Sequence, residues 1–228
     1  EDLWVRQTKA LNFAYAHVNV AKTAKRVTVD DAINHQPKSQ ITGGRRYAFA
    51  ISGQQNLVTR SESRDGRHDY VFHSVVAGPN VFHDSVAINA NSDTGPHHRW
   101  STGGLFDNIV TNNEINARNR GNSGTGHGWA GANMVSWNST AKKFRFYNPP
   151  TAQNWAIGNV GTREGSAYYD SHGTRVTPNS LYESQLAERT ALKDLEYREY
   201  WLGDIDGFTG NNDSSVDQVY VDPAWSAA

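Results

Sequence analysis

The chain has 228 residues, of which 37% are hydrophobic and 11% aromatic, and this is enough for one sizeable core. Its 22 lysines and arginines balance 23 aspartates and glutamates, so overall charge predicts no nucleic-acid or membrane partner. Cysteine is absent, which excludes disulfides and thiolate zinc sites. No apolar run approaches the roughly 20 residues that span a bilayer.

The first residues already have the pattern of strand interiors. Two short alternating runs, 11–15 and 27–29, follow one another with no polar or helical cap in front of them. We therefore expect a preceding segment, from a longer precursor or a partner chain, to supply earlier coils of the same fold.

An internal repeat follows. A glycine, basic residues and an aromatic recur in segments 44–47, 66–70, 95–100 and 126–129. A second turn glycine comes after each segment and leads into short alternating runs such as 56–59 and 80–83. A period of about 22 to 30 residues, filled with short strands, is typical of a β-solenoid. We predict about five stacked coils over residues 10–165, with the four segments superposed.

Three stretches also carry a family resemblance: NSDTGPHHRW (91–100), GTGHGWAGAN (124–133) and PPTAQNWAIG (149–158). Together they resemble secreted proteins of the pectin-lyase-like superfamily, and the similarity spans roughly residues 10–165. The resemblance implies an all-β, right-handed parallel β-helix with three sheets and a carbohydrate partner. The calcium-binding aspartates and the arginine base of pectate lyases have no residue-by-residue match here.

The pattern changes after Gly165. Ser180 and Glu183 form a capping box, and leucines at helical spacing follow up to Leu195, which predicts a helix over 180–202. We assign residues 1–165 to the coils and 166–228 to a C-terminal capping helix and tail. The pair Asp204 and Asp206 lacks the ligand spacing of an EF-hand loop. We predict no cofactor and leave calcium open.

Stacking places the basic segments of successive coils beside one another, in a column up one face. The predicted catalytic residues are His68, His97, His98, Arg99 and His127. The predicted substrate-binding residues are Arg45, Arg46, Arg67, Tyr70, Trp100 and Trp129.

This column has the groups that β-elimination of a uronic-acid polymer needs. Arginine neutralises the substrate carboxylate, with Arg67 and Arg99 as candidates, and histidine exchanges protons near neutral pH. Tyr70 is a further candidate proton donor. We predict a polysaccharide lyase acting on an acidic polysaccharide. One methionine and two sequons, at Asn138 and Asn212, agree with secretion.

Alternatives remain at this stage. A glycoside hydrolase needs two carboxylates, for which Glu62, Asp65, Asp69 and Asp93 lie near the column. Three histidines from successive coils would suit a metal, although side chains in one column run parallel. A non-catalytic carbohydrate-binding or structural β-helix is the third alternative. We expect His17, His35 and His172 at the surface, and His73 and His83 within strands.

Overall fold

The computed structural model describes residues 1–192. The chain divides after Ser180 into two compact units, Glu1–Ser180 and Leu181–Ala228. The first unit is built of short strands and turns, and the described part of the second is a helix over 181–192. The fold is therefore all-β with parallel sheets and one short helix in the part of the chain that is described.

The strands of the first unit form three main parallel sheets. The eight-stranded first sheet contains, in order, β1 (Leu3–Arg6), β4 (Val27–Asp30), β7 (Asn56–Thr59), β10 (Asn80–His83), β14 (Gly104–Asp107), β17 (Val135–Trp137), β19 (Trp155–Ile157) and β21 (Tyr168–Asp170). The seven-stranded second sheet contains β2 (Lys9–Leu11), β5 (Ile33–His35), β8 (Glu62–Arg64), β11 (Val86–Ile88), β15 (Val110–Ala117), β18 (Thr140–Phe146) and β20 (Val160–Glu164).

The third sheet is shorter. It contains β3 (Val18–Val20), β6 (Phe49–Ile51), β9 (Tyr70–Phe72) and β12 (Gly95–Pro96), and a separate pair joins β13 (Ser101–Thr102) to β16 (Gly131–Ala132). Beyond β12, the long strand β15 lies next in the stack, because Thr94, just before β12, forms a parallel β-bridge with Ile115 of β15. The third sheet ends at β12, and the loop 118–130 follows β15.

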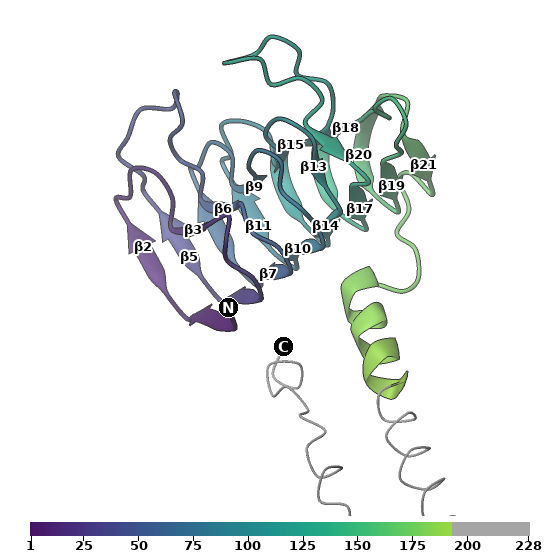
Figure 1. The fold of residues 1–228 in the computed structure, drawn as a ribbon, viewed down its shortest axis with the longest axis horizontal. Helices are drawn as coiled ribbons and strands as arrows, with labels where there is room; N and C mark the ends of the chain where they lie inside the picture. The colour runs from purple at the N-terminus through teal and green to yellow at the C-terminus, as the bar shows by residue number, and fades with distance from the viewer. Residues whose placement is uncertain (193–228) are drawn as a thin grey trace, which may run out of the picture. The chain divides into compact units, whose positions relative to one another are not determined.

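Successive strands of each sheet come from successive passes of the chain, as Figure 1 shows for unit 1. Asn56 pairs with Asn80 and Thr59 with His83, in the residue-by-residue alignment that the repeat predicts. Coil-to-coil contacts join residues 24 apart at Asn56, 30 apart at Ile109 and 20 apart at Met134. This arrangement is compatible with a parallel β-helix.

The number of coils was predicted too low. Seven strands stack in the second sheet, against about five predicted coils. The glycine–basic–aromatic segment occurs in four passes of the chain, and both the first pass and the passes after residue 134 lack it. The first sheet also gains β21, which lies beyond residue 165.

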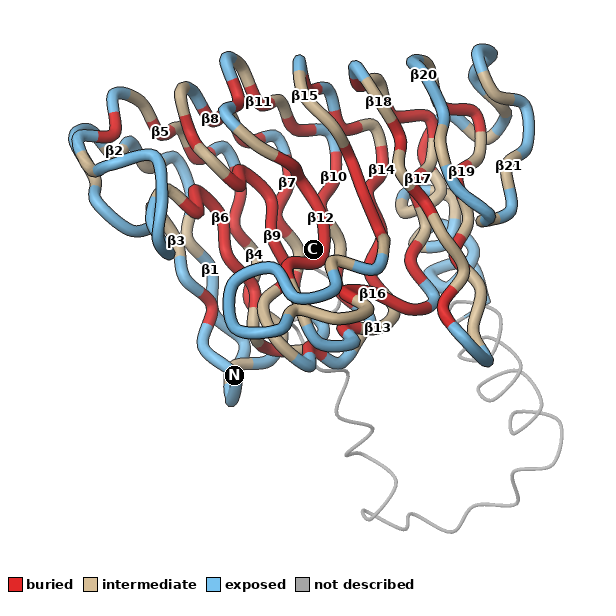
Figure 2. The backbone as a smooth tube through the Cα atoms, turned by 90° about the horizontal axis from the view of Figure 1, so that it is seen from above, coloured by how far each residue is buried: buried red, intermediate tan, exposed pale blue. Residues whose placement is uncertain are grey.

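The core is a stack of aromatic rings inside the coils, and Figure 2 shows the buried strands with exposed turns between them. Phe82 stacks on Phe106 with centroids 5.7 Å apart, and Phe49 stacks on Tyr70 at 5.4 Å. Each ring comes from one coil and covers the ring of the next. Burying one such side chain stabilises the fold by about 1.5–3 kcal/mol.

Polar ladders at the turns fix the register of the coils. The Asn80 Oδ1 atom accepts hydrogen bonds from the backbone N–H and the Nδ2 of Asn56, both at 3.0 Å. Ser85 Oγ accepts from the backbone N–H of Ser61 in the coil before it. These side chains are buried, so each bond satisfies a backbone group that water does not reach.

The predicted helix begins directly after Ser180, whose hydroxyl donates to Asp107 Oδ2 at 2.8 Å. Within the helix Leu186 is half-buried and Leu192 is exposed. Leu195, the acidic pair 204–206 and the sequon at Asn212 lie outside the described residues. At the other end, Leu3 and Trp4 of β1 are exposed. Whether other coils precede them stays a prediction.

Candidate functional site

Four histidines converge beside the end of the third sheet. His68 precedes β9, His97 and His98 follow β12, and His127 ends the glycine-rich part of the loop after β15. The His97 ring is 4.6 Å from the ring of His68, 5.0 Å from that of His98 and 4.8 Å from that of His127, between centroids. We call these four residues the histidine cluster. All of them were predicted from the repeat.

The register that brings them together differs from the predicted one. Phe49 pairs with Tyr70, which places Tyr47 beside His68, and these two rings stack at 5.3 Å. Phe72 pairs with Pro96, so the chain leaves β9 at His73 where it leaves β12 at His97. The four glycine–basic–aromatic segments therefore do not superpose. Because the loops before the third sheet differ in length, the segments enter it at different points and their histidines converge.

A buried ion pair lies next to the cluster. The guanidinium of Arg120 donates from one nitrogen to Asp93 Oδ2 at 3.1 Å and to His97 Nδ1 at 3.2 Å. The Asp93 and Arg120 side chains are only 6% and 9% exposed. Burial would raise the pKa of the Asp93 carboxyl, but His68 and Arg120 outweigh it and hold that pKa well below its usual value. The pair is therefore charged in the folded protein.

His97, beside this pair, is neutral. Burial lowers the pKa of His97 to about 2, and the Coulombic interactions with His68 and Arg120 act in the same direction. Burial also lowers the pKa of His98 and of His127, with neighbouring cationic groups adding to the effect. A neutral imidazole has one nitrogen that accepts a proton and one that donates. Each neutral imidazole can therefore accept a proton on one nitrogen and donate one from the other.

His127 is held by its loop. Gly124 has a φ of +55°, and a Cβ there would lie 2.2 Å from the Cε1 atom of His127. Arg99 secures the same loop, because its guanidinium donates to the carbonyl oxygen of Thr125 at 3.1 Å and to the Thr125 hydroxyl at 2.6 Å. Arg99 was predicted to be catalytic, and its observed contacts are those of a loop anchor.

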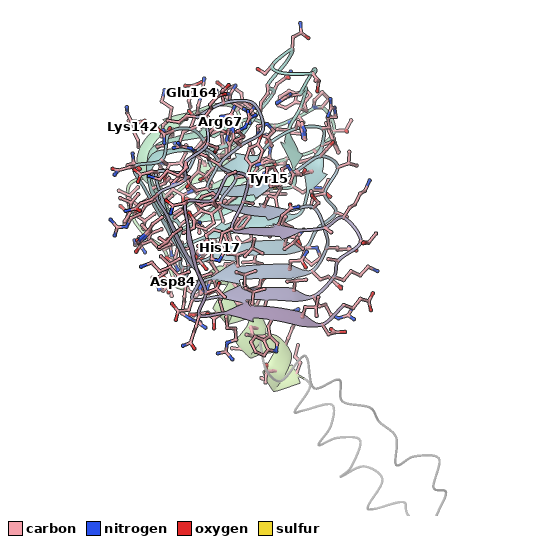
Figure 3. All side chains as sticks on the ribbon, turned by 90° about the vertical axis from the view of Figure 1, so that its left-hand side faces the viewer. Tyr15, His17, Arg67, Asp84, Lys142 and Glu164 are labelled. Atoms are coloured by element: carbon pink, nitrogen blue, oxygen red, sulfur yellow. The ribbon has the colours of Figure 1, made fainter. Side chains whose placement is uncertain are left out.

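Tyr47 forms an aromatic centre that sequence reasoning missed. Its ring stacks on His68 and meets His73 edge-on at 5.3 Å, and its hydroxyl lies 3.4 Å from His97 Nε2. Arg67 lies 6.0 Å from the Tyr47 centroid, and Tyr15 contacts the same ring; Figure 3 labels both. Tyr47 belongs to the first glycine–basic–aromatic segment, and this signal could have identified it.

The remaining predicted binding residues lie in different surroundings. Arg67 lies at the cluster, and its NH1 atom is buried with no hydrogen-bond partner among the described residues. Trp100 is 39% exposed, and Trp129 is half-buried one coil further on. Arg45 is exposed, and Arg46 is tied to the carbonyl oxygens of Ser39 and Asp65.

Tyr70 does not belong to the site. Its ring is fully buried in the core, and its hydroxyl donates to the carbonyl oxygens of Ser61 and Val86, both at 2.9 Å. The period-two alternation of the strand turns this side chain inward, away from any substrate. We therefore withdraw it as a binding residue and as a proton donor.

The carboxylates near the cluster are enclosed. Asp93 is committed to Arg120 and His68, and Glu62 pairs with His35 and Arg64. Asp69 is completely buried and accepts a hydrogen bond from Ser63, and burial raises its pKa to about 6. These contacts are typical of structural carboxylates.

Within residues 1–192, no group of three or more histidine, aspartate or glutamate side chains is placed to hold a metal ion. The chemistry of His97 agrees with this finding. A histidine that binds a metal through one nitrogen donates from the other, but here Arg120 donates to Nδ1 of His97. His97 Nε2 therefore carries its proton and has no lone pair for a metal.

Comparison of the chain with protein-family models, with curated proteins and with solved structures finds no match. In the described part of the chain, no helix is both long enough and apolar enough to cross a membrane. The sequon at Asn138 is fully buried, so in the folded protein this residue is not available to a glycan.

Proposed function

We propose that this chain is a secreted polysaccharide lyase that cleaves an acidic, uronic-acid-containing polysaccharide by β-elimination. We further propose that its coils form a right-handed parallel β-helix of the pectin-lyase-like kind. One observation carries the proposal: neutral histidines that can exchange protons converge beside an arginine with an unsatisfied nitrogen. Proton transfer and charge neutralisation are the two tasks of this reaction.

The roles follow from the surroundings of each group. Arg67, whose NH1 atom is buried without a hydrogen-bond partner among the described residues, is the group that would bind the substrate carboxylate. His98 and His127 would supply the base and the acid, because they are the two half-buried members of the cluster, whereas His68 and His97 are buried. Trp100 is exposed enough to contact a sugar ring.

The reaction balances with these groups alone. The base takes the C5 proton of the uronate, and the C5–H electron pair becomes the C4–C5 double bond. The C4–oxygen bond breaks, and the leaving oxygen takes a proton from the acid. The arginine lowers the barrier because negative charge develops on the substrate carboxylate at the moment that the C5 proton leaves.

The test is incubation with a panel of acidic polysaccharides while the ultraviolet absorbance of unsaturated uronates is followed. A rise with at least one polymer supports a lyase, and it should disappear in the variant His98→Ala but persist in His172→Ala. His172 provides a matched control because its ring bonds the Gly161 carbonyl oxygen and packs against Phe144 and Tyr169, which are not members of the cluster. New reducing ends without a rise in absorbance would instead indicate a hydrolase. The absence of both signals would contradict catalysis.

One part of the proposal concerns the C-terminal helix. The helix that starts after Ser180 would cover the last coil, since an uncovered stack presents unpaired strand edges.

A further inference from the structure

The hydrogen bonds of the cluster determine where its protons lie. Arginine has only donors, so the contact between Arg120 and His97 at 3.2 Å requires a lone pair on His97 Nδ1. A neutral imidazole with an unprotonated Nδ1 carries its proton on Nε2. His97 is therefore a donor at Nε2.

This donor lies 3.4 Å from the Tyr47 hydroxyl, which can accept from it, and closer to a nitrogen of a second histidine. The Nε2 atoms of His97 and His127 are 3.2 Å apart, a distance that admits one proton between them. Since His97 supplies that proton, His127 Nε2 must accept it. His127 then carries its own proton on Nδ1, an atom that is buried and has no hydrogen-bond partner among the described residues.

We infer that Arg120, held in place by Asp93, sets the proton positions on two successive histidines, with His97 protonated on Nε2 and His127 on Nδ1. Arg120 is a positioning residue, because it acts through His97. The Asp93–Arg120 contact at 3.1 Å orients the guanidinium, and the low exposure of both side chains keeps competing water away.

This order of protons separates the roles of the two outer histidines, a step that rests on the proposed function. The Nε2 lone pair of His127 is occupied by His97, so His127 can only offer the proton on Nδ1 and is the acid. His98 makes no hydrogen bond to His97 or His127 in the structure, although its ring lies 5.0 Å from each. His98 is therefore left as the base.

The test is a long-range proton–nitrogen correlation spectrum of the full chain with nitrogen-15 in its histidines, recorded near neutral pH without substrate. Single histidine variants assign the signals. We expect His97 to show the Nε2–H form and His127 the Nδ1–H form. In solution the Nε2–H form of histidine is the commoner, so the His127 signal is the diagnostic one. A His97 protonated on Nδ1, or a His127 protonated on Nε2, would overturn the inference.

Two variants examine Arg120 itself. Arg120→Lys keeps a donor and should retain both proton positions, and Arg120→Met removes it and should lose the Nδ1–H form of His127. Unchanged spectra in Arg120→Met would show that Arg120 does not set the protons. If that variant does not fold, the spectrum of the unmodified chain still tests the two proton positions. Since no substrate is present, this result is independent of whether any polysaccharide is cleaved.

Discussion

The side chain of Asn138 pairs with the backbone of Val176 at both ends. Its Nδ2 atom donates to the Val176 carbonyl oxygen, and its Oδ1 atom accepts from the Val176 N–H, each at 2.8 Å. The residue is fully buried and has a φ of 47°, a conformation that asparagine adopts more readily than most residues. This one side chain joins the turn after β17 to the segment that precedes the helix.

We expect Asn138→Ala to lower the free energy of unfolding by about 2–4 kcal/mol, because it leaves the half-buried N–H and carbonyl of Val176 without these partners. Urea denaturation measures this loss. Asn89→Ala is the matched control, since Asn89 has a similar φ of 54° but is exposed. Equal losses in the two variants would show that backbone conformation, and not the paired hydrogen bonds, explains the effect.

His97 and His98 should respond differently to truncation. His98→Ala should lower kcat by about 100-fold, the usual contribution of a general base, with little change in melting temperature. His97→Ala should lower the melting temperature, because it removes a buried ring and the acceptor of the Arg120 hydrogen bond. Turnover and thermal melting of both proteins measure this difference. Full activity of His98→Ala would contradict its assignment as the base.

Arg99→Lys should loosen the loop 121–128 although it keeps the positive charge. An ammonium group cannot reproduce the two contacts of the guanidinium with Thr125. We expect faster hydrogen exchange or proteolysis within this loop, detected by mass spectrometry. Arg45→Lys is the control, because Arg45 is exposed and its one side-chain hydrogen bond within residues 1–192 is to the nearby Gly43 carbonyl oxygen. Equal protection in the two variants would contradict the anchoring role of Arg99.

Acid should destabilise the fold through its buried histidines. Burial lowers the pKa of His73 to about 4 from its ordinary value of 6.5, and the Coulombic interactions with His98 and His68 act in the same direction. Between these values the unfolded chain binds a proton that the folded chain does not, so this contribution to stability falls as the pH drops below about 6.5. His73→Gln does not titrate and should lose less stability than the unmodified chain between about pH 7.5 and pH 5. Parallel losses in urea denaturation would contradict this prediction.

Asp69 should make the stability of the fold depend on pH in the opposite direction. Burial raises its pKa to about 6, so between its ordinary value of 3.8 and 6 the folded chain binds the extra proton. Within this range stability is lost as the pH rises, because the unfolded chain ionises this carboxyl more readily than the folded chain does; above about pH 6 the loss is complete and a charge lies in the core. The stability of Asp69→Asn relative to the unmodified chain should therefore increase from about pH 5 to about pH 8. Urea midpoints of both proteins at these two pH values measure the change. A constant difference would show that Asp69 does not titrate in this range.

The sequence by itself determined the parallel, coil-by-coil arrangement of the strands. The runs Asn56–Thr59 and Asn80–His83 pair residue by residue, because polar ladders and stacked rings need the same residue type at the same place in each coil. The start of the helix after Ser180 was equally readable from its capping residues. The repeat also identified the four histidines, since basic segments one period apart fall in neighbouring coils.

Only the tertiary structure decided how these histidines are arranged. Tyr47 lies beside His68 because Phe49 pairs with Tyr70, and no local pattern specifies this register. Arg120 reaches Asp93 across 27 residues of sequence, from a loop that carries no strand periodicity. Loop lengths set where each coil enters the third sheet, and a repeat in residue types does not record them. The pairing of charges and the positions of protons therefore follow from packing between coils.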